Sequence, residues 1–220
     1  MWLSMNVVEL FSSIDGEGRR QGLLTTFLRL HDCNIRCSYC DTLYSYGPNS
    51  TFENINVQDV ANRIEELGNY RITITGGEPL LQEVEVIELI DELAKRNENY
   101  DINIETNGTI VPSFHRPNTW FTYDYKTPSS LAEEYVDVDI FKVATERDII
   151  KFVVGSLEDL DAMRRVIVTY PTKGQIYVSP VWGRIEGSTI IDYMQAYNLQ
   201  DVRFQLQIHK FIWDPNAKGV

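Results

Sequence analysis

Short apolar strands alternate with amphipathic helices along most of the chain, and this alternation strongly limits the fold. A helix is predicted from Val57 to Leu67, where apolar residues recur at helical spacing between a capping Asn56 and a terminating Gly68. Further helices are expected over residues 86–93 and after two capping boxes, Ser156 with Asp159 and Thr189 with Asp192. Strands are expected at residues 7–11, 24–30, 71–75, 101–105, 120–123, 149–154, 175–179 and 202–206.

This order of elements is typical of parallel β/α units. With only about four helices, an α/β fold of this kind gives an incomplete, or partial, β/α barrel rather than a closed one. No linker or repeat divides the chain, so residues 1–220 are expected to form a single domain. The aromatic C-terminal segment after residue 208 is a candidate cover for the open barrel, although an ordinary surface tail has the same composition.

Polar or small residues follow the ends of the expected strands. Because functional residues of parallel β/α folds lie at the carboxyl ends of the strands, these positions should surround one common mouth. They are Cys33, Gly76, Glu105, Lys126, Ser179 and Gln207.

All three cysteines of the chain, Cys33, Cys37 and Cys40, lie within eight residues. Thiolates at this spacing can converge on one inorganic centre, and a set of three leaves a position of an iron–sulfur cluster open to another ligand. Zinc is the rival, because His31 would complete a Cys3His set. Cysteines used only for packing have no reason to crowd into one loop. The cysteine stretch alone leaves cluster and zinc open.

Composition narrows the range of partners. The chain has 32 acidic and 20 basic side chains, a net charge of -12, which disfavours nonspecific binding to nucleic acid and favours a small substrate. No apolar run is long enough for a signal peptide or a membrane span. We therefore expect no membrane partner and a cytoplasmic location, where clustered thiols stay reduced.

A glycine turn, Gly76-Gly77-Glu78-Pro79, follows the strand at residues 71–75. Glycines let backbone groups approach a ligand closely, and carbonyls with Glu78 offer acceptors for an amino group. An open iron could bind the amino and carboxylate groups of a methionine moiety while this turn holds the amino group. A zinc site would not need such an arrangement.

The two motifs together carry a family resemblance. Cys33-x3-Cys37-x2-Cys40, with Tyr39 before the last cysteine and a Gly-Gly-Glu-Pro turn on the next β/α unit, resembles the radical S-adenosylmethionine (SAM) superfamily. Within it the chain is similar to the 7-carboxy-7-deazaguanine synthases of queuosine and 7-deazapurine biosynthesis. The similarity extends nearly end to end, through residues 11–18, 27–30, 40–42, 104–108 and 205–210.

The resemblance implies a lyase with a 4Fe-4S cluster, SAM and Mg²⁺ as cofactors. Reductive cleavage of SAM gives a deoxyadenosyl radical that removes hydrogen from 6-carboxy-5,6,7,8-tetrahydropterin, after which the ring contracts and ammonia leaves. It also implies a homodimer and an electron donor such as flavodoxin or ferredoxin.

Site residues carry over by position. The resemblance assigns the cluster to Cys33, Cys37 and Cys40, and Mg²⁺, which prefers oxygen ligands, to Thr42. For SAM it implies Tyr39, Asp41, Gly76, Gly77, Glu78, Asn107, Lys126 and Ser179. For the pterin it implies Ile14, Asp15, Gly16, Arg29, Thr75 and Val220, with Arg29 suited to a carboxylate through bidentate bonds.

Three positions depart from the family pattern. Asp15 stands where many relatives have glutamine, Asp124-Tyr125-Lys126 replaces a common Ser-Pro-Lys, and Ser179-Pro180 replaces a frequent Gln-Pro. Direct ligand contact and an ordinary rim position are both open for Glu105, Gln207 and His209.

Two other functions remain as alternatives. A radical SAM activase that installs a glycyl radical on a partner protein would share the cysteine loop but not the setting of Thr42 and Arg29. A zinc-stabilised binding protein would share the cysteines and not need the glycine turn.

Overall fold

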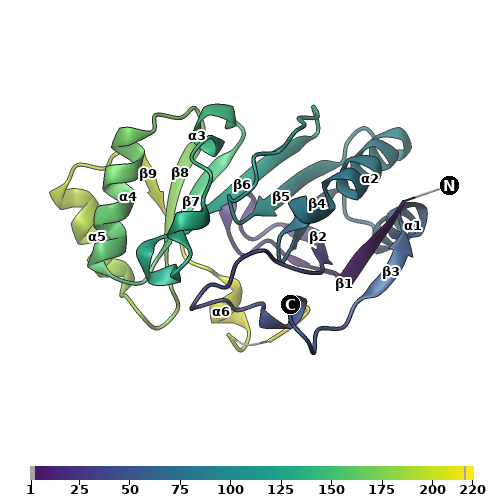
Figure 1. The fold of residues 1–220 in the computed structure, drawn as a ribbon, viewed down its shortest axis with the longest axis horizontal. Coiled ribbons are helices and arrows are strands. Elements are labelled where there is room, and N and C mark those ends of the chain that lie inside the picture. The colour runs from purple at the N-terminus through teal and green to yellow at the C-terminus, as the bar shows by residue number, and fades with distance from the viewer. Residues whose placement is uncertain (1–2, 216) are drawn as a thin grey trace.

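A curved sheet of nine strands forms the centre of the molecule, in a computed structural model that describes residues 3–215 and 217–220. The strands are β1 (Ser4–Ile14), β2 (Leu24–Leu30), β3 (Glu53–Asn56), β4 (Arg71–Gly76), β5 (Asp101–Thr106), β6 (Thr119–Tyr125), β7 (Ile149–Val154), β8 (Gln175–Pro180) and β9 (Val202–Phe204). The α-helices are α1 (Val57–Leu67), α2 (Glu83–Arg96), α3 (Ile140–Val143), α4 (Leu157–Thr169), α5 (Gly187–Ala196) and α6 (His209–Ile212). Figure 1 shows α1, α2, α4 and α5 along the outside of the sheet and α6 beside the C-terminus.

The sheet has the order β3-β1-β2-β4-β5-β6-β7-β8-β9 and does not close on itself. Strands β2 and β4 to β9 pair in parallel, as the alternation predicts. Strand β1 is longer than expected and runs antiparallel to β2 and to the unpredicted β3. The expected partial β/α barrel is therefore confirmed, with an antiparallel edge.

Side chains on the parallel strands alternate between an apolar outer face and a polar inner face, because successive residues of a strand point to opposite sides. On the outer face, residues such as Ile74 and Ile104 belong to one buried core with residues of the covering helices. On the inner face, Thr75, Glu105 and Lys151 line a cavity. A barrel interior filled with polar side chains is suited to ligand chemistry.

Local signals placed two helices correctly and one incorrectly. Asn56 accepts a hydrogen bond from the Asp59 amide at the start of α1, and Ser156 caps α4 in the same way through Asp159. Helix α5, however, begins at Gly187 with Glu186 as its N-cap, so the predicted capping by Thr189 was wrong. The turn of helix starts earlier because the Thr189 amide already donates to the Glu186 carbonyl. The expected helix positions are otherwise confirmed, and the short α3 and α6 were not predicted.

No helix within residues 3–215 and 217–220 is both long and apolar enough to span a bilayer.

Candidate active site

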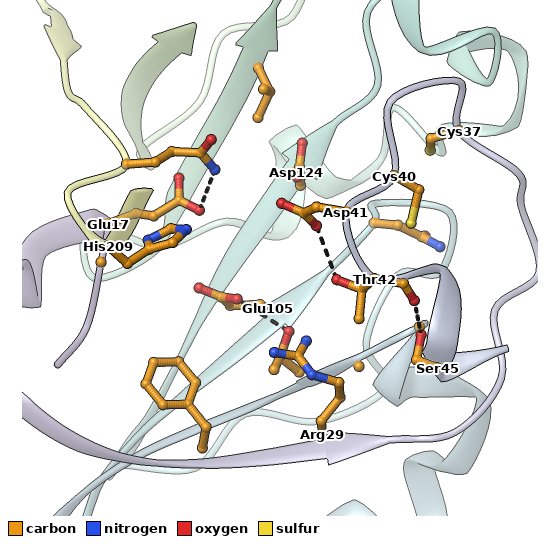
Figure 2. A pocket seen from close by; sticks show the side chains of 18 of the residues that line it. Glu17, Arg29, Cys37, Cys40, Asp41, Thr42, Ser45, Glu105, Asp124 and His209 are labelled. Carbon is orange, nitrogen blue, oxygen red and sulfur yellow. Dashed lines mark hydrogen bonds between the residues drawn. The ribbon is translucent and has the colours of Figure 1, made fainter. Parts of the chain in front are cut away.

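A cavity of about 270 Å³ opens at the carboxyl ends of the parallel strands. Its wall is built from the loops after β1, β2, β4, β5 and β6 and from the C-terminal segment. Figure 2 shows Cys37 and Cys40 on one side of this cavity and Glu17 and His209 on the other. The predicted site residues that line it are Ile14, Asp15, Gly16, Arg29, Cys33, Cys37, Tyr39, Cys40, Asp41, Thr42, Thr75, Gly76, Gly77, Asn107, Lys126 and Val220. Glu105, Gln207 and His209 also line it, whereas Glu78 and Ser179 are fully buried outside the lining.

The cysteine loop is held in shape by hydrogen bonds of its own backbone. The Cys33 amide donates to Oδ1 of Asp32 at 2.7 Å, and the Ser38 amide donates to the Ser130 carbonyl at 2.9 Å. Arg36 donates from Nη1 to the Cys33 carbonyl at 2.6 Å. All three cysteines are unpaired and partly accessible from the cavity. The loop therefore presents three thiols to one space.

The donor geometry separates a cluster from a zinc site. Within residues 3–215 and 217–220, no three His, Cys, Asp or Glu side chains are close enough to hold one metal ion together. His31, the fourth ligand of the zinc alternative, is bonded through Nε2 to Oγ of Ser50 at 2.7 Å and packs on Phe52. A 4Fe-4S cluster has no such requirement, because each thiolate binds a different iron. The cysteine loop fits the cluster better than it fits zinc.

Burial raises the pKa of Cys37 to about 11 in the absence of metal. Its thiol is therefore protonated at neutral pH, and binding of iron must release that proton.

The glycine turn packs backbone to backbone against the segment that leads into the cysteine loop. The Gly77 amide donates to the Leu30 carbonyl and the Glu78 amide to the Asp32 carbonyl, at 3.2 and 2.8 Å. A Cβ atom on Gly77 would lie 1.8 Å from the Asp32 carbonyl oxygen, and one on Gly76 would lie 2.3 Å from that of Leu30. Both glycines are therefore required by the approach of two protein segments, whatever ligand they also bind.

Glu78 connects this turn to the end of β5. Its carboxylate accepts from the Leu80 amide at 2.9 Å, from the Asn107 amide at 2.7 Å and from the Thr106 hydroxyl. Asn107 in turn donates from Nδ2 to Sγ of Cys33 at 3.6 Å. The Glu78 carboxylate thus acts inside the protein, where it holds Asn107 against the cysteine loop.

Paired charges occupy the inner face of the barrel. Lys151 lies 3.3 Å from Oε1 of Glu17 and 3.6 Å from Oδ2 of Asp124, and Lys126 lies 3.1 Å from the same Asp124 oxygen. Burial would raise the pKa of Glu17, but Lys151 and a hydrogen bond from Gln207 outweigh burial and lower it. Glu17 is therefore ionised at neutral pH, with its second oxygen, Oε2, unpaired among the described atoms.

Asp15 belongs to a separate hydrogen-bond network around Arg20. Its Oδ2 accepts from Nε of the buried Arg20 at 3.1 Å, and Arg20 also donates to the Ile72 and Asp101 carbonyls. This arrangement accounts for an acid at position 15, because a carboxylate oxygen accepts directly from the Arg20 guanidinium. The pair fixes the loop that presents Gly16 and Glu17 to the cavity.

The C-terminal segment lines the cavity beside this loop, through residues such as His209 and Val220. The Ile208 amide donates to the Gly16 carbonyl at 3.1 Å, and Lys210 donates to Oδ2 of Asp41 at 3.0 Å. A Cβ on Gly16 would lie 1.9 Å from Nδ1 of His209, so the two segments are in tight contact. The expected covering role of the segment is confirmed.

Glu17 and Lys151 were not singled out as site residues from the sequence. Glu17 lies in the loop after β1, of which only residues 14–16 were assigned to the pterin. Lys151 is the one charged residue in the apolar strand β7 and is 6% exposed, and a buried lysine needs a paired acid. An isolated charge in a strand of this kind was the available signal.

Glu105 lies at the centre of the cavity beside Arg29 (Figure 2), where its Oε2 accepts from the Thr75 hydroxyl at 3.2 Å. Burial raises the pKa of Glu105 from 4.5 to about 7, and burial raises that of Glu78 to about 7 as well. In both cases the folded state keeps a proton that the unfolded chain loses. Each residue therefore costs stability as the pH rises from 4.5 through 7.

Glu105→Gln should stabilise the protein by about 1–3 kcal/mol at pH 8 and by almost nothing at pH 4, because the amide stays neutral and still accepts from Thr75. Glu78→Gln should instead destabilise it by about 1–3 kcal/mol at pH 4, because the new amide nitrogen faces only donors, and by less at pH 8, where the wild type carries the cost of ionising Glu78. Urea unfolding of the apoproteins across this pH range measures both. Equal effects of the two substitutions would contradict the different environments assigned to them.

Comparison with known proteins gives one consistent family. A model of the radical SAM superfamily matches residues 29–150. A 7-carboxy-7-deazaguanine synthase of Clostridium acetobutylicum is 40% identical over 99% of this chain and 100% of its own length. The synthase of Methanospirillum hungatei is 39% identical over 96% of this chain and 86% of its length. The synthase of Chlorobaculum tepidum is 33% identical over 98% of this chain and 97% of its own length.

The fold has a match among solved structures. A crystal structure of QueE from Escherichia coli superposes with a TM-score of 0.75 and covers 92% of this chain and 93% of that chain, at 23% identity. This likeness supports the open radical SAM barrel. From the family model, the full-length relatives and the cysteine loop above the barrel, the chain belongs to the radical SAM superfamily of iron–sulfur enzymes and, within it, to the 7-carboxy-7-deazaguanine synthase family.

Proposed function

We propose that the chain converts 6-carboxy-5,6,7,8-tetrahydropterin into 7-carboxy-7-deazaguanine, with loss of ammonia, in the biosynthesis of queuosine and related 7-deazapurines. The observation that carries the proposal is that the cysteine loop and a cavity lined by charged side chains form one continuous space. Full-length relatives at 40% and 39% identity bear the name of this activity.

The cofactors are assigned to the cavity rim. Cys33, Cys37 and Cys40 would hold the 4Fe-4S cluster. The SAM side of the cavity comprises Tyr39, Asp41, Gly76, Gly77, Asn107 and Lys126. Bound together, the cluster and SAM supply the reducing electron and the acceptor of a substrate hydrogen atom. Glu78 contributes indirectly, because its carboxylate holds Asn107 in place. Ser179 is buried in β8, and its hydroxyl, unpaired among the described atoms, is an available hydrogen-bond donor.

Magnesium is a further part of the proposal. The Thr42 hydroxyl donates to Oδ1 of Asp41 at 3.0 Å, so two oxygen donors lie together at the edge of the cavity. Oxygen ligands of this kind suit Mg²⁺, which keeps several waters and binds one or two protein groups. We assign the metal to Thr42.

The substrate side of the cavity presents complementary charges. The guanidinium of Arg29 is aimed into the cavity (Figure 2) and suits the carboxylate of the pterin through bidentate bonds. Glu17 offers a carboxylate acceptor to the N–H groups of the ring, and Glu105, with its pKa raised to about 7, offers a carboxyl group that accepts or donates a hydrogen bond. Thr75, the loop 14–16 and Val220 complete this wall.

The proposal also includes one domain over residues 1–220, a homodimer, a cytoplasmic location and an electron donor such as flavodoxin or ferredoxin. The edge strands of the open sheet, β3 and β9, support the homodimer, and the three free cysteines support the location.

A glycyl radical activase is less well supported. Its substrate would be a segment of a partner protein, whereas this cavity is partly closed by C-terminal residues such as His209, Lys210 and Val220 and is lined by several paired charges. Charges arranged around a small space suit a compact polar substrate.

The test is an anaerobic assay of cluster-reconstituted protein with reductant, SAM, Mg²⁺ and 6-carboxytetrahydropterin, followed by mass spectrometry. We expect 7-carboxy-7-deazaguanine to form and SAM to be regenerated. A brown, reducible protein that cleaves SAM without making the deazaguanine would keep the superfamily and overturn the proposed substrate.

A further inference from the structure

The odd-numbered side chains of strand β1 point to one side of the sheet up to Val7 and to the other side from Glu9 onward. Val7 pairs with Leu30 and Glu9 pairs with Arg29, so the register shifts by one residue at this point. Before the shift, Met5 and Val7 are buried in the apolar core. After it, Phe11 lines the cavity and stacks on Phe27 at 5.2 Å. An irregularity of this kind re-aims side chains, and here it turns Glu9 toward the cavity side of the sheet.

Glu9 consequently lies directly across from Arg29, where cross-strand side chains meet. Its Oε1 accepts from Nε of Arg29 at 2.6 Å and from the Tyr44 hydroxyl at 2.8 Å. Burial raises the pKa of Tyr44 to about 12, so this hydroxyl keeps its proton and acts as the donor. One carboxylate oxygen is therefore fixed from two sides.

The bond to Glu9 uses only Nε of the Arg29 guanidinium. Neither Nη1 nor Nη2 has a hydrogen bond to an atom of residues 3–215 or 217–220. These two nitrogens form the outer edge of the planar group, which matches a carboxylate with two parallel bonds. The Arg29 side chain is 16% exposed and that of Glu9 is 20%, so the pair is largely shielded from bulk water, and Arg29 lines the cavity.

We propose that Glu9 is a positioning residue that, held by Tyr44, orients Arg29 so that both of its terminal nitrogens face the carboxylate of the substrate. The inference rests on the proposed function and extends it from the arginine to the pair that aims it. A plain surface ion pair would contribute little. This pair instead sets the direction of a group whose two free donors lie in the cavity, and so determines preference for a carboxylated pterin.

The test measures binding rather than turnover alone. The reconstituted holoenzyme with SAM is titrated anaerobically with 6-carboxypterin and, separately, with pterin, which lacks the carboxylate. Wild type should prefer 6-carboxypterin. Glu9→Ala should weaken binding of 6-carboxypterin about 10-fold and leave the affinity for pterin unchanged. Glu9→Gln should lose less affinity for 6-carboxypterin, because its amide oxygen still accepts from Nε of Arg29. Tyr44→Phe should lose about 2- to 3-fold in the same affinity. In turnover, KM for the tetrahydropterin should rise while kcat and KM for SAM stay close to wild type.

The matched control is Glu53→Gln, which removes an exposed carboxylate paired with Arg63 at 2.8 Å on the neighbouring strand β3. It should change the affinity for neither 6-carboxypterin nor pterin. Thermal unfolding of each variant checks that the fold is kept. If Glu9→Ala binds 6-carboxypterin as tightly as wild type, or loses both pterins equally, the positioning role is overturned. If wild type itself shows no preference for 6-carboxypterin, the assignment of Arg29 under the proposed function fails, and this inference fails with it.

Discussion

Replacing Cys37 with alanine should abolish product formation and SAM cleavage while leaving the folded apoprotein intact. The loss is expected to exceed about 1,000-fold, because two thiolates cannot hold a cluster that needs three and keeps one iron open for SAM. The fold should survive because the loop is held by bonds that do not involve this sulfur, such as that from the Ser38 amide to the Ser130 carbonyl. Iron and sulfide analysis and thermal unfolding of the apoprotein measure the two effects separately.

Ser38→Ala is the matched control, since Ser38 is the neighbouring residue and its hydroxyl donates to the Ser129 carbonyl at 2.6 Å. It should bind a full cluster and retain most activity. A Cys37→Ala protein that contains a full complement of iron and cleaves SAM normally would show that another residue holds the cluster. An apoprotein of Cys37→Ala that fails to fold would show that the loop depends on this side chain directly.

Elements defined by local signals could be predicted from the sequence almost to the residue. Helix α1 has its two ends at Asn56 and Gly68, and β2 extends over the same residues as expected. Such boundaries are readable because capping bonds and hydrophobic periodicity depend on neighbours in the chain. The parallel order of the later strands followed from the same reasoning, since a strand, a helix and a strand leave few alternatives.

The rest depended on pairings between distant segments. The direction of β1, its shift at Val7 and the existence of β3 arise from pairing with other segments, at separations from 10 residues at the Ile14–Leu24 pair to 52 at the Ser4–Asn56 pair. The site shows the same limit. Glu78 has the acceptors expected for an amino group, yet Thr106 and Asn107 use them, and no local pattern in the turn foretells those donors. Asp15 could be recognised as unusual but not as the partner of Arg20, which lies at the base of β4 and β5.

The glycine turn and the cysteine loop are packed so closely that one added carbon atom, the Cβ of an alanine at Gly77, should force the two segments apart. Gly77→Ala is expected to destabilise the folded protein by about 2–4 kcal/mol and to prevent assembly of a full cluster. The new Cβ would lie 1.8 Å from the Asp32 carbonyl oxygen and 2.8 Å from Cβ of Cys33, so neither backbone can remain in place. Asp32 already has a left-handed backbone, with φ of 78°, and its carboxylate accepts from the Cys33 amide, so its displacement carries the first cysteine with it. Denaturant unfolding of the apoprotein and iron content after reconstitution are the measurements.

Gly155→Ala separates this effect from a general intolerance of alanine. A Cβ at Gly155 would meet its nearest neighbour, Cδ of the flexible Arg184 side chain, at 3.3 Å, and neither Gly155 nor Gly77 has a left-handed backbone. Gly155→Ala should therefore keep the iron content of wild type and hold its free energy of unfolding to within about 1 kcal/mol, with a slight gain from a less flexible unfolded chain. If Gly77→Ala matched it in both measurements, the turn would have room for a side chain. The glycines would then serve the ligand alone, and the close packing of the turn against the cysteine loop would have no part in building the site.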